Sequence, residues 1–302
     1  MARPNIGRPS SSFGSRRTTL RLNQRWRIGA CYRLVREDFH VGLLDSKKAL
    51  IFGVANDHSI AWGIAQALHA HGATVGFSSV ESLIERRVRP LAQSLGSTFV
   101  EPCDVQDDAQ IERVFARWRD AEGEGSLDIL VHALAFAKRE DLAGAFVDTS
   151  RDGFALALDV SAYSLVAVTR AAVPVFAPGA SVLTLTYYGA EKVVANYNVM
   201  GVAKAALEAS VRYLAADLGP RGIRVNAISS GPVRTLAAAG IAGFKSMYGQ
   251  FREVAPLRSN ITIEDVGGAA VFLSSSLAGA ISGEVLYVDG GFNVLGVPVG
   301  EG

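Results

Sequence analysis

The sequence predicts an α/β protein built on a doubly wound, mainly parallel sheet, and three observations support this class. Short apolar runs alternate with longer helical segments from residue 41 onward. The short runs are continuously apolar, as strands buried on both faces must be. No linker rich in Pro or Gly interrupts residues 41–302. We therefore expect a single domain in which right-handed crossovers join parallel strands.

The predicted elements follow one another in a regular alternation. Strands are expected in the short apolar runs, at Lys48–Phe52, Ala73–Phe77, Thr98–Val100, Leu127–Val131, Ser181–Thr186, Ile223–Ile228 and Val285–Val288. Helices are expected in the longer segments between them, at Ile60–Ala70, Leu83–Leu95, Ile111–Trp118, Phe154–Val175, Gly201–Leu218 and Ile263–Leu273. The loops at the carboxyl ends of such strands are where open α/β sheets bind ligands.

Composition argues against several classes of function. Lys and Arg number 30 against 29 Asp and Glu, and this balance gives no electrostatic case for a nucleic-acid or membrane partner. The cysteines, Cys31 and Cys103, and the five histidines show no metal-ligand spacing, so we expect no metal site. No apolar run reaches the length that we expect of a membrane span, and the cysteine usage is typical of a reduced, cytoplasmic protein.

Residues 1–40 differ in composition from the rest of the chain. They hold nine Arg, are rich in Ser and contain only two acidic residues, Glu37 and Asp38. This composition is typical of a disordered basic arm or of an organelle transit peptide. We expect a dispensable extension. The alternatives are a working targeting peptide, which would place the protein in an organelle, and a reading frame that starts too early.

The first crossover is predicted to bind a dinucleotide. Gly53 ends the first strand, Ser59 can cap the helix that begins at Ile60, and Gly63 lets that helix approach the strand or a pyrophosphate closely. The string GxGxxG itself is absent, so the prediction rests on the order strand, Gly loop, helix at the start of an alternating chain. An ordinary turn between a strand and a helix is the alternative.

Two later loops are further candidates for the same Rossmann-type site. Asp104 and Val105 follow the third strand, where a carboxylate can bond an adenine amino group. Asp104 could instead cap the next helix. The small residues of His132–Phe136 follow the fourth strand and would let the backbone approach a ribose, although a buried apolar turn is the alternative. The run Val80–Glu81 after the second strand does not decide between NAD and NADP.

Tyr197 and Lys204 form the candidate catalytic pair. They are seven residues apart, so on a helix both side chains return to one face, about 10 Å apart along the axis. The ammonium can hold a cofactor hydroxyl and lower the pKa of the phenol, which can then donate to an oxygen that gains negative charge. A buried Tyr beside a surface Lys is the alternative.

The motifs of residues 41–292 taken in order resemble the bacterial enoyl-acyl-carrier-protein reductase, a divergent branch of the short-chain dehydrogenase/reductase superfamily. The motifs that carry the resemblance are Gly53–Ala55, Ser59–Gly63, Cys103–Val105, Tyr187–Glu191, Asn196–Gly201, Ala203–Lys204, Arg224–Ser229, Gly231–Pro232, Arg234–Ala238, Ile281–Val285 and Val288–Gly291. Ordinary members of the superfamily, which reduce ketones, place Tyr four residues before Lys. Met200 occupies that position here, and Tyr197 lies about one helical turn earlier, which favours reduction of C=C over C=O.

The resemblance implies a role for each matching residue. Lys204 would bind the nicotinamide ribose, Tyr197 would stabilise the enolate of the thioester, and Tyr187 would lie at the substrate end of the site. The implied cofactor-binding residues are Gly53, Ser59, Ile60, Val80, Asp104, Val105, Leu134, Lys204, Val233 and Thr235. The implied substrate-binding residues are Ala135, Phe136, Ala137, Leu142, Tyr187, Tyr197, Met200, Ala237, Ala238, Ile241 and Phe244. Core packing is the alternative for the apolar members.

The resemblance also implies the substrate, the cofactor and the assembly. We expect a homotetramer that reduces trans-2-enoyl-acyl-carrier-protein with NADH, or alternatively with NADPH, because Val80 stands where the family usually has a glutamine. Ala135 replaces a glycine of the family. The segment from Thr235 to about Gln250 is expected to be a mobile lid. A ketone reductase of the same superfamily and a non-catalytic dinucleotide sensor are the rival functions.

Overall fold

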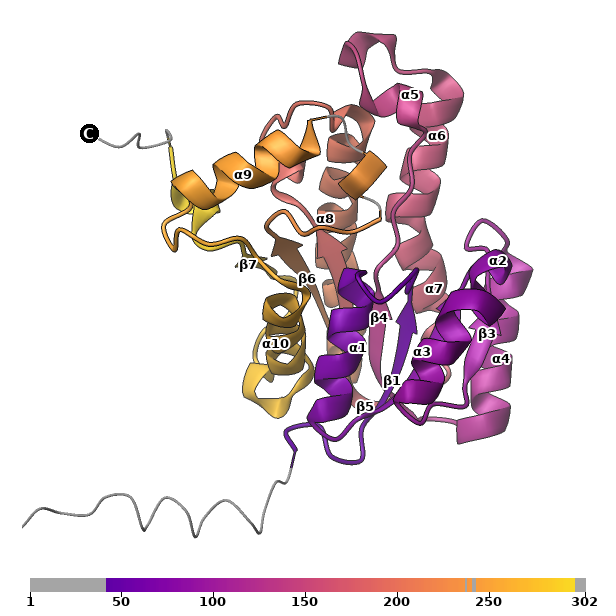
Figure 1. Cartoon of the computed structure of the whole chain (residues 1–302). Helices are drawn as coiled ribbons and strands as arrows, with labels where there is room; N and C mark the ends of the chain where they lie inside the picture. The colour runs from indigo at the N-terminus through magenta and orange to yellow at the C-terminus, as the bar shows by residue number, and fades with distance from the viewer. Residues whose placement is uncertain (1–41, 237, 241–242, 297–302) are drawn as a thin grey trace, which may run out of the picture. The chain divides into compact units, whose positions relative to one another are not determined.

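A seven-stranded parallel sheet forms the centre of the fold (Figure 1). The computed structural model describes residues 42–296, apart from 237, 241 and 242. The strand order is β3-β2-β1-β4-β5-β6-β7, and every neighbouring pair is parallel. The strands are β1 (Lys48–Phe52), β2 (Thr74–Ser79), β3 (Val100–Pro102), β4 (Leu127–His132), β5 (Phe176–Thr186), β6 (Arg224–Ser230) and β7 (Val285–Val288). The doubly wound parallel sheet expected from the sequence is confirmed.

Helices cover both faces of this sheet. The α-helices are α1 (Ile60–Ala70), α2 (Glu81–Leu83), α3 (Arg89–Ser94), α4 (Asp108–Glu122), α5 (Arg139–Leu142), α6 (Arg151–Leu158), α7 (Ser164–Ala172), α8 (Asn198–Leu218), α9 (Phe244–Val254) and α10 (Ile263–Ser274). Two π-helical segments, η1 (Ile84–Val88) and η3 (Asp159–Tyr163), join α2 to α3 and α6 to α7. Short 3-10 turns are η2 (Phe146–Asp148), η4 (Tyr188–Ala190), η5 (Gly219–Arg221), η6 (Ala238–Gly240), η7 (Ser276–Ala278) and η8 (Phe292–Val294).

The strand β1 shows how the hydrophobic core divides into two layers. Ala49 and Ile51 belong to a buried cluster that includes side chains of α1 and α10, whereas Leu50 and Phe52 belong to a cluster with α4, α7 and α8. Successive side chains of a strand point to opposite faces, so a strand that is buried on both sides must be continuously apolar. This is why the short apolar runs predicted the strands.

Helices α1 and α10 pack closely through two glycines. A Cβ at Gly63 would lie 2.5 Å from Ile263, and a Cβ at Gly267 would lie 2.8 Å from the Gly63 carbonyl oxygen and from the Cβ of Ala67. The close neighbour of Gly63 is therefore a second helix and not the strand, and an approach to a pyrophosphate stays a prediction. The glycine allows two helices on one face of the sheet to come together.

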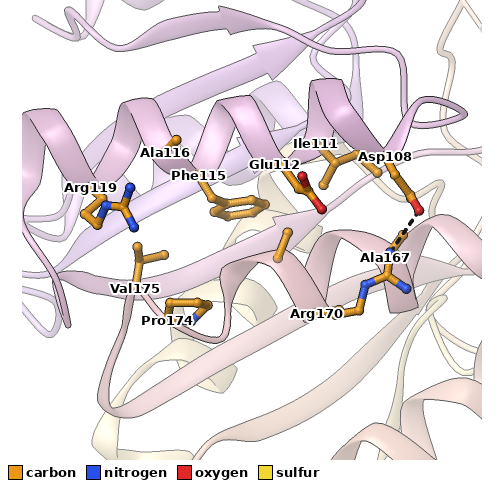
Figure 2. A pocket seen from close by; sticks show the side chains of 11 residues that line it. Asp108, Ile111, Glu112, Phe115, Ala116, Arg119, Ala167, Arg170, Pro174 and Val175 are labelled. Atoms are coloured by element: carbon orange, nitrogen blue, oxygen red, sulfur yellow. Dashed lines mark hydrogen bonds and ion pairs between the residues drawn. The ribbon is translucent and has the colours of Figure 1, made fainter.

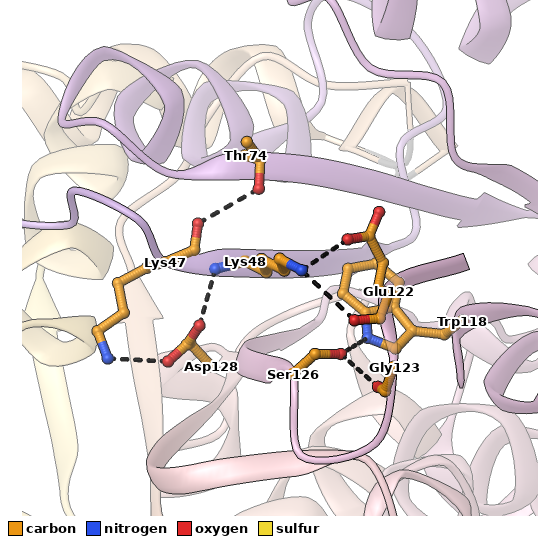
Figure 3. A network of polar contacts seen from close by, with 8 residues as sticks. All are labelled: Lys47, Lys48, Thr74, Trp118, Glu122, Gly123, Ser126 and Asp128. Carbon is orange, nitrogen blue, oxygen red and sulfur yellow. Dashed lines mark hydrogen bonds and ion pairs between the residues drawn. The ribbon is translucent and has the colours of Figure 1, made fainter. Parts of the chain in front are cut away.

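A polar network fixes the amino-terminal edge of the sheet (Figure 3). Asp128, at the start of β4, accepts hydrogen bonds from Lys47 Nζ at 2.8 Å and from the backbone N–H of Lys48 at 2.9 Å. Lys48 Nζ lies 2.8 Å from Glu122 at the end of α4. The network joins β1, β4 and α4 at the edge opposite to the carboxyl ends of the strands, where the predicted site lies.

The long helix from α6 through η3 to α7 corrects one expectation. Residues Arg151–Ala172 are long and apolar enough to cross a membrane by length and composition, contrary to the prediction. Of the most hydropathic stretch of that helix, a share of 44 % is buried inside the molecule. Leu165, Val168 and Ala172 are fully buried in the core cluster that includes β4 and β5. Packing against the sheet therefore accounts for much of this apolar character.

Candidate active site

Gly53 makes the tight turn that the first crossover requires. Its φ is +99°, in the left-handed region that glycine favours, and a Cβ would lie 2.1 Å from the carbonyl oxygen of Ala133. The loops that follow β1 and β4 therefore touch at this point. Only glycine allows that approach, and the gap between neighbouring strands is where a dinucleotide pyrophosphate is usually held.

Ser59 occupies the N-cap position of α1 without capping it through its side chain. The Ser59 hydroxyl instead donates to the carbonyl oxygen of Asn56, within the same loop. The predicted position is therefore right, and the predicted capping bond is wrong. Ile60 begins α1 as expected.

The loop after β3 leaves the Asp104 side chain exposed. The carboxylate accepts a hydrogen bond from the backbone N–H of Gln106 at 3.0 Å, while Val105 is buried. Asp107, not Asp104, caps α4 by accepting from the N–H groups of Ala109 and Gln110. The alternative interpretation of Asp104 as the helix cap is therefore wrong.

At the tip of β2, Val80 is 43 % exposed and Glu81 begins α2. Ser79 is buried and donates to the carbonyl oxygen of Val54 at 3.1 Å, which ties β2 to the loop after β1. The exposed residue at the end of β2 is thus the apolar Val80, and the nearest carboxylate in the sequence is that of Glu81.

Some of the predicted substrate residues gather around Tyr197. One hydrophobic cluster contains Tyr197 and Met200, with Ala137, Leu142 and Tyr187 packed against it. Leu134 is half-buried, whereas Ala135 and Phe136 are exposed on the loop that follows β4. The structure therefore brings the end of β5, the start of α8 and the loop after β4 together.

The spacing of Tyr197 and Lys204 predicted that both lie on one helix, but Tyr197 lies just before it. It is the residue before α8, between Asn196 and Asn198, whose φ angles of 60° and 33° are in the left-handed region. This turn places the Tyr197 ring against the Tyr187 ring, with centroids 5.1 Å apart and an interplanar angle of 70°. A Cβ at Gly189 would lie 2.5 Å from the Tyr197 ring, so glycine is required under it.

The two phenols stay protonated. Burial raises the pKa of Tyr197, and Tyr187 and Glu208 contribute to the rise. Burial also raises the pKa of Tyr187 to about 12. The expectation that Lys204 lowers the pKa of Tyr197 is therefore wrong, because burial dominates. Both hydroxyls are hydrogen-bond donors at neutral pH.

Lys204 is buried and tied to the end of β5. Its Nζ donates to the carbonyl oxygen of Leu185 at 2.7 Å. Burial lowers the pKa of Lys204 to about 8, and the carboxylate of Glu208 opposes this shift. The alternative interpretation, a surface lysine, is wrong, because only 5 % of Lys204 is exposed.

Glu208 is a member of this site that the sequence argument missed. It lies one turn beyond Lys204 on α8 and accepts a hydrogen bond from the Thr186 hydroxyl at 2.6 Å. Burial raises the pKa of Glu208. Its position four residues after Lys204, on the same helix face, is the signal that could have revealed it.

Helix α9 forms one wall of the site, beyond the carboxyl ends of β6 and β7 in Figure 1. The Tyr187 hydroxyl lies 3.6 Å from Met247 Sδ, and the Arg234 guanidinium lies 4.5 Å from the Tyr248 ring centroid. Thr235 accepts a hydrogen bond from the N–H of Ala238. Val233 and Ala238 are buried and Phe244 is half-buried, whereas the predicted substrate residues Ala237 and Ile241 lie outside the described residues.

A separate cavity of about 350 Å³ lies between α4 and α7 (Figure 2). An ion pair of Arg170 with Asp108, at 3.1 Å, lies in its lining. None of the predicted site residues lines it. In the part of the chain that the structure describes, no group of three or more His, Cys, Asp or Glu side chains could hold a metal ion.

The sheet order, the glycine turn after β1 and the buried Tyr–Lys pair define a dinucleotide-dependent oxidoreductase of the short-chain dehydrogenase/reductase type. The family model described as enoyl-(acyl carrier protein) reductase matches residues 53–293. The chain therefore belongs to the enoyl-acyl-carrier-protein reductase family.

Individual relatives agree with this assignment. The chain is 51% identical over 256 residues to enoyl-[acyl-carrier-protein] reductase [NADH] 1 of Rhizobium meliloti, covering 85% of this chain and 93% of the relative. A crystal structure of the Bacillus cereus enoyl-acyl carrier protein reductase with NADP⁺ and an indole naphthyridinone has a TM-score of 0.83 and 52% identity, covering 85% of this chain and all of that one. An Anaplasma phagocytophilum reductase in complex with NAD has a TM-score of 0.82 and 49% identity, covering 85% of this chain and 98% of that one.

Proposed function

We propose that this protein reduces the trans-2 double bond of enoyl-acyl-carrier-protein with NADH, in fatty-acid synthesis. The observation that carries the proposal is the placement of Tyr197. Its protonated hydroxyl is buried beside Tyr187, while Met200 holds the position four residues before Lys204. Met has no proton to donate, so the donor in this site is displaced from the position that serves ketone reduction.

The residues present fit a bound dinucleotide. At Gly53 the loops after β1 and β4 meet so closely that a Cβ would clash with the Ala133 carbonyl oxygen, and Asp104 is exposed beside the buried Val105 on another loop at the carboxyl ends of the strands. Bound NADH would supply the hydride that reduces the β-carbon of the enoyl group. Lys204 would hold the ribose hydroxyls by donating from its ammonium group, which now donates to Leu185.

Tyr197 would act on the substrate oxygen. Because its pKa is raised, the hydroxyl donates a hydrogen bond to the thioester oxygen and stabilises the negative charge of the enolate. Protonation at the α-carbon then completes the reduction. Tyr187, whose hydroxyl lies against Met247, would line the acyl end of the site.

NADH is the proposed cofactor because the relatives that are similar over most of this chain are named as NADH enzymes. NADPH is the alternative, since the exposed residue at the tip of β2 is the uncharged Val80 and the similar Bacillus cereus structure contains NADP⁺. A 2′-phosphate would meet no carboxylate from Val80 itself, although Glu81 follows it directly.

A cytoplasmic homotetramer is the proposed form of the protein. Val202 and Tyr213 return to the same face of α8 after about three helical turns, and both are exposed, Tyr213 to 76 %. Tyr163, on the adjoining π-helical segment, is also exposed. Such apolar groups fit burial against a second copy of the chain. The proposal includes no nucleic-acid or membrane partner.

A spectrophotometric assay with a crotonyl thioester, run with NADH and with NADPH, tests the function. The proposal predicts oxidation of NADH that depends on the thioester, with a small ketone as the negative control. Turnover of the ketone without turnover of the thioester would assign the chain to ketone reduction. Tight NADH binding without turnover of either compound would indicate a dinucleotide sensor.

A further inference from the structure

Ser161 holds the loop after β4 by two hydrogen bonds to one residue. Its hydroxyl accepts from the backbone N–H of Phe136 at 2.9 Å and donates to the carbonyl oxygen of the same residue at 3.1 Å. Ser161 has no exposed surface. A buried hydroxyl that satisfies both the donor and the acceptor of one peptide residue fixes the position of that residue in two directions.

The start of this loop is held by the N–H of Ala133, which donates to the Phe52 carbonyl oxygen at 3.1 Å, and Ser161 supplies the next fixed point along the chain. Residues 133–138 have no regular secondary structure, and the side chains of Ala135 and Phe136 are exposed. Ala137, directly after the fixed residue, packs against the cluster that contains Tyr197 and Met200. The backbone of Phe136 is therefore fixed directly before the residue that packs against the Tyr197 cluster.

The π-helical segment η3 is what presents Ser161 to this loop. A π-helical turn adds a residue to the helix and shifts the faces before and after it. Asp159, two positions earlier, accepts a hydrogen bond from the Gln106 side chain at 3.0 Å, in the loop after β3. Ser164, three positions later, lies 2.8 Å from the buried His132 ring at the end of β4. One stretch of helix thus reaches three segments at the carboxyl edge of the sheet.

We propose that Ser161 is a positioning residue for enoyl reduction, which holds the Ala135–Ala137 wall of the substrate site at a fixed distance from Tyr197. The inference rests on the proposed function and assigns a separate role to a residue of the helix. Ser161 touches neither reacting atom in this account. It acts through the backbone of Phe136, so its loss should disturb how the enoyl group is aligned more than how the adenosine end of the cofactor is bound.

The test compares Ser161→Ala with Thr169→Val in the full chain. Thr169 lies on the same helix and is buried, and its hydroxyl has no hydrogen-bond partner among the residues that the structure describes. Ser161→Ala should lower kcat for a crotonyl thioester by roughly tenfold or more and raise its KM, because small misplacements of a substrate wall are costly. The Kd for NADH should change less than about twofold. Thr169→Val should keep kcat within about twofold of the unmodified protein.

A second measurement does not depend on activity, and its first part uses only the unmodified protein. In the unmodified protein, the Phe136 amide should be protected from hydrogen exchange although its side chain is exposed, because the N–H donates to a buried oxygen. Ser161→Ala should remove that protection. Free exchange of the Phe136 amide in the unmodified protein, or a kcat and KM for Ser161→Ala that match those of Thr169→Val, would overturn the proposal. If the unmodified protein did not turn over the thioester but its Phe136 amide were protected, the proposed function would be refuted. The two hydrogen bonds between Ser161 and the backbone of Phe136 would still be supported.

Discussion

The ring of Tyr197 is packed against Tyr187 and over Gly189, and this packing decides what the hydroxyl can do. Burial raises the pKa of Tyr197, so the group donates a hydrogen bond and does not act as a phenolate. Lys204 was expected to lower the pKa of Tyr197, but its observed contact is with the end of β5. Its ammonium lies against the carbonyl of Leu185, and its own pKa is brought close to the physiological range by burial.

The affinity for NADH is predicted to fall as the pH rises through about 8. Burial lowers the pKa of Lys204 to about 8, so its charge is present below that pH and lost above it. Glu208→Gln removes the carboxylate that raises the pKa of Lys204 and should move the fall to lower pH. His132, the other ionisable group coupled to Lys204, stays neutral because burial lowers its pKa to about 3.

Fluorescence titration of NADH binding across about pH 6 to pH 10 measures this effect. The exposed Lys192, replaced in Lys192→Met, serves as the control and should leave the profile unchanged. An affinity that is constant over the range, or a midpoint that is the same in Glu208→Gln, would contradict the assigned role of Lys204.

At the scale of the elements, the contact between α1 and α10 gives a stability prediction. Gly267→Ala would place a methyl group 2.8 Å from Ala67 and from the carbonyl oxygen of Gly63, so the helices must separate. We expect a loss of about 1–3 kcal/mol in the free energy of unfolding. The neighbouring Gly268 has no heavy atom within 4 Å of a Cβ, so Gly268→Ala should be neutral or slightly stabilising.

Thermal and urea unfolding of the two variants measure the difference. Both changes replace Gly by Ala in one helix at adjacent positions, so their intrinsic effects on helix formation cancel. Equal midpoints for Gly267→Ala and Gly268→Ala would show that the glycine contact does not limit the packing of these helices.

The elements themselves were largely predictable, and the exceptions have physical reasons. Helix Ile60–Ala70 and strand Val285–Val288 have the predicted bounds, because their apolar runs end at turn residues. The π-helical segments were missed because one added residue leaves an apolar helix looking continuous. Helix α9 was missed because its sequence has a single buried residue, Phe251, and a tertiary contact of Met247 fixes part of it.

Over the whole molecule, the two ends of the parallel strands serve different purposes, one structural and one functional. The amino-terminal edge is closed by the ion pairs of Lys47 and Lys48. The carboxyl ends of the strands bring together the Gly53 turn, the loop that Ser161 holds by hydrogen bonds, and the group of Tyr197, Lys204 and Glu208. The motifs identified Tyr197 and Lys204 in sequence. The contacts of this group with β5, from Lys204 to the Leu185 carbonyl and from Thr186 to Glu208, depend on the packing of α8 on β5, although the spacing of Lys204 and Glu208 along the helix is visible in the sequence.

Single-turnover reduction of a crotonyl thioester by Tyr197→Phe, beside the unmodified protein, tests the central claim most directly. Phe keeps the ring packing on Tyr187 and removes only the hydroxyl. We expect reduction to slow by roughly 10²-fold, the usual effect of losing one donor to a developing oxyanion, while the Kd for NADH stays within about twofold. An unchanged rate of reduction in Tyr197→Phe, with NADH bound as tightly as before, would contradict the claim that this hydroxyl stabilises the enolate.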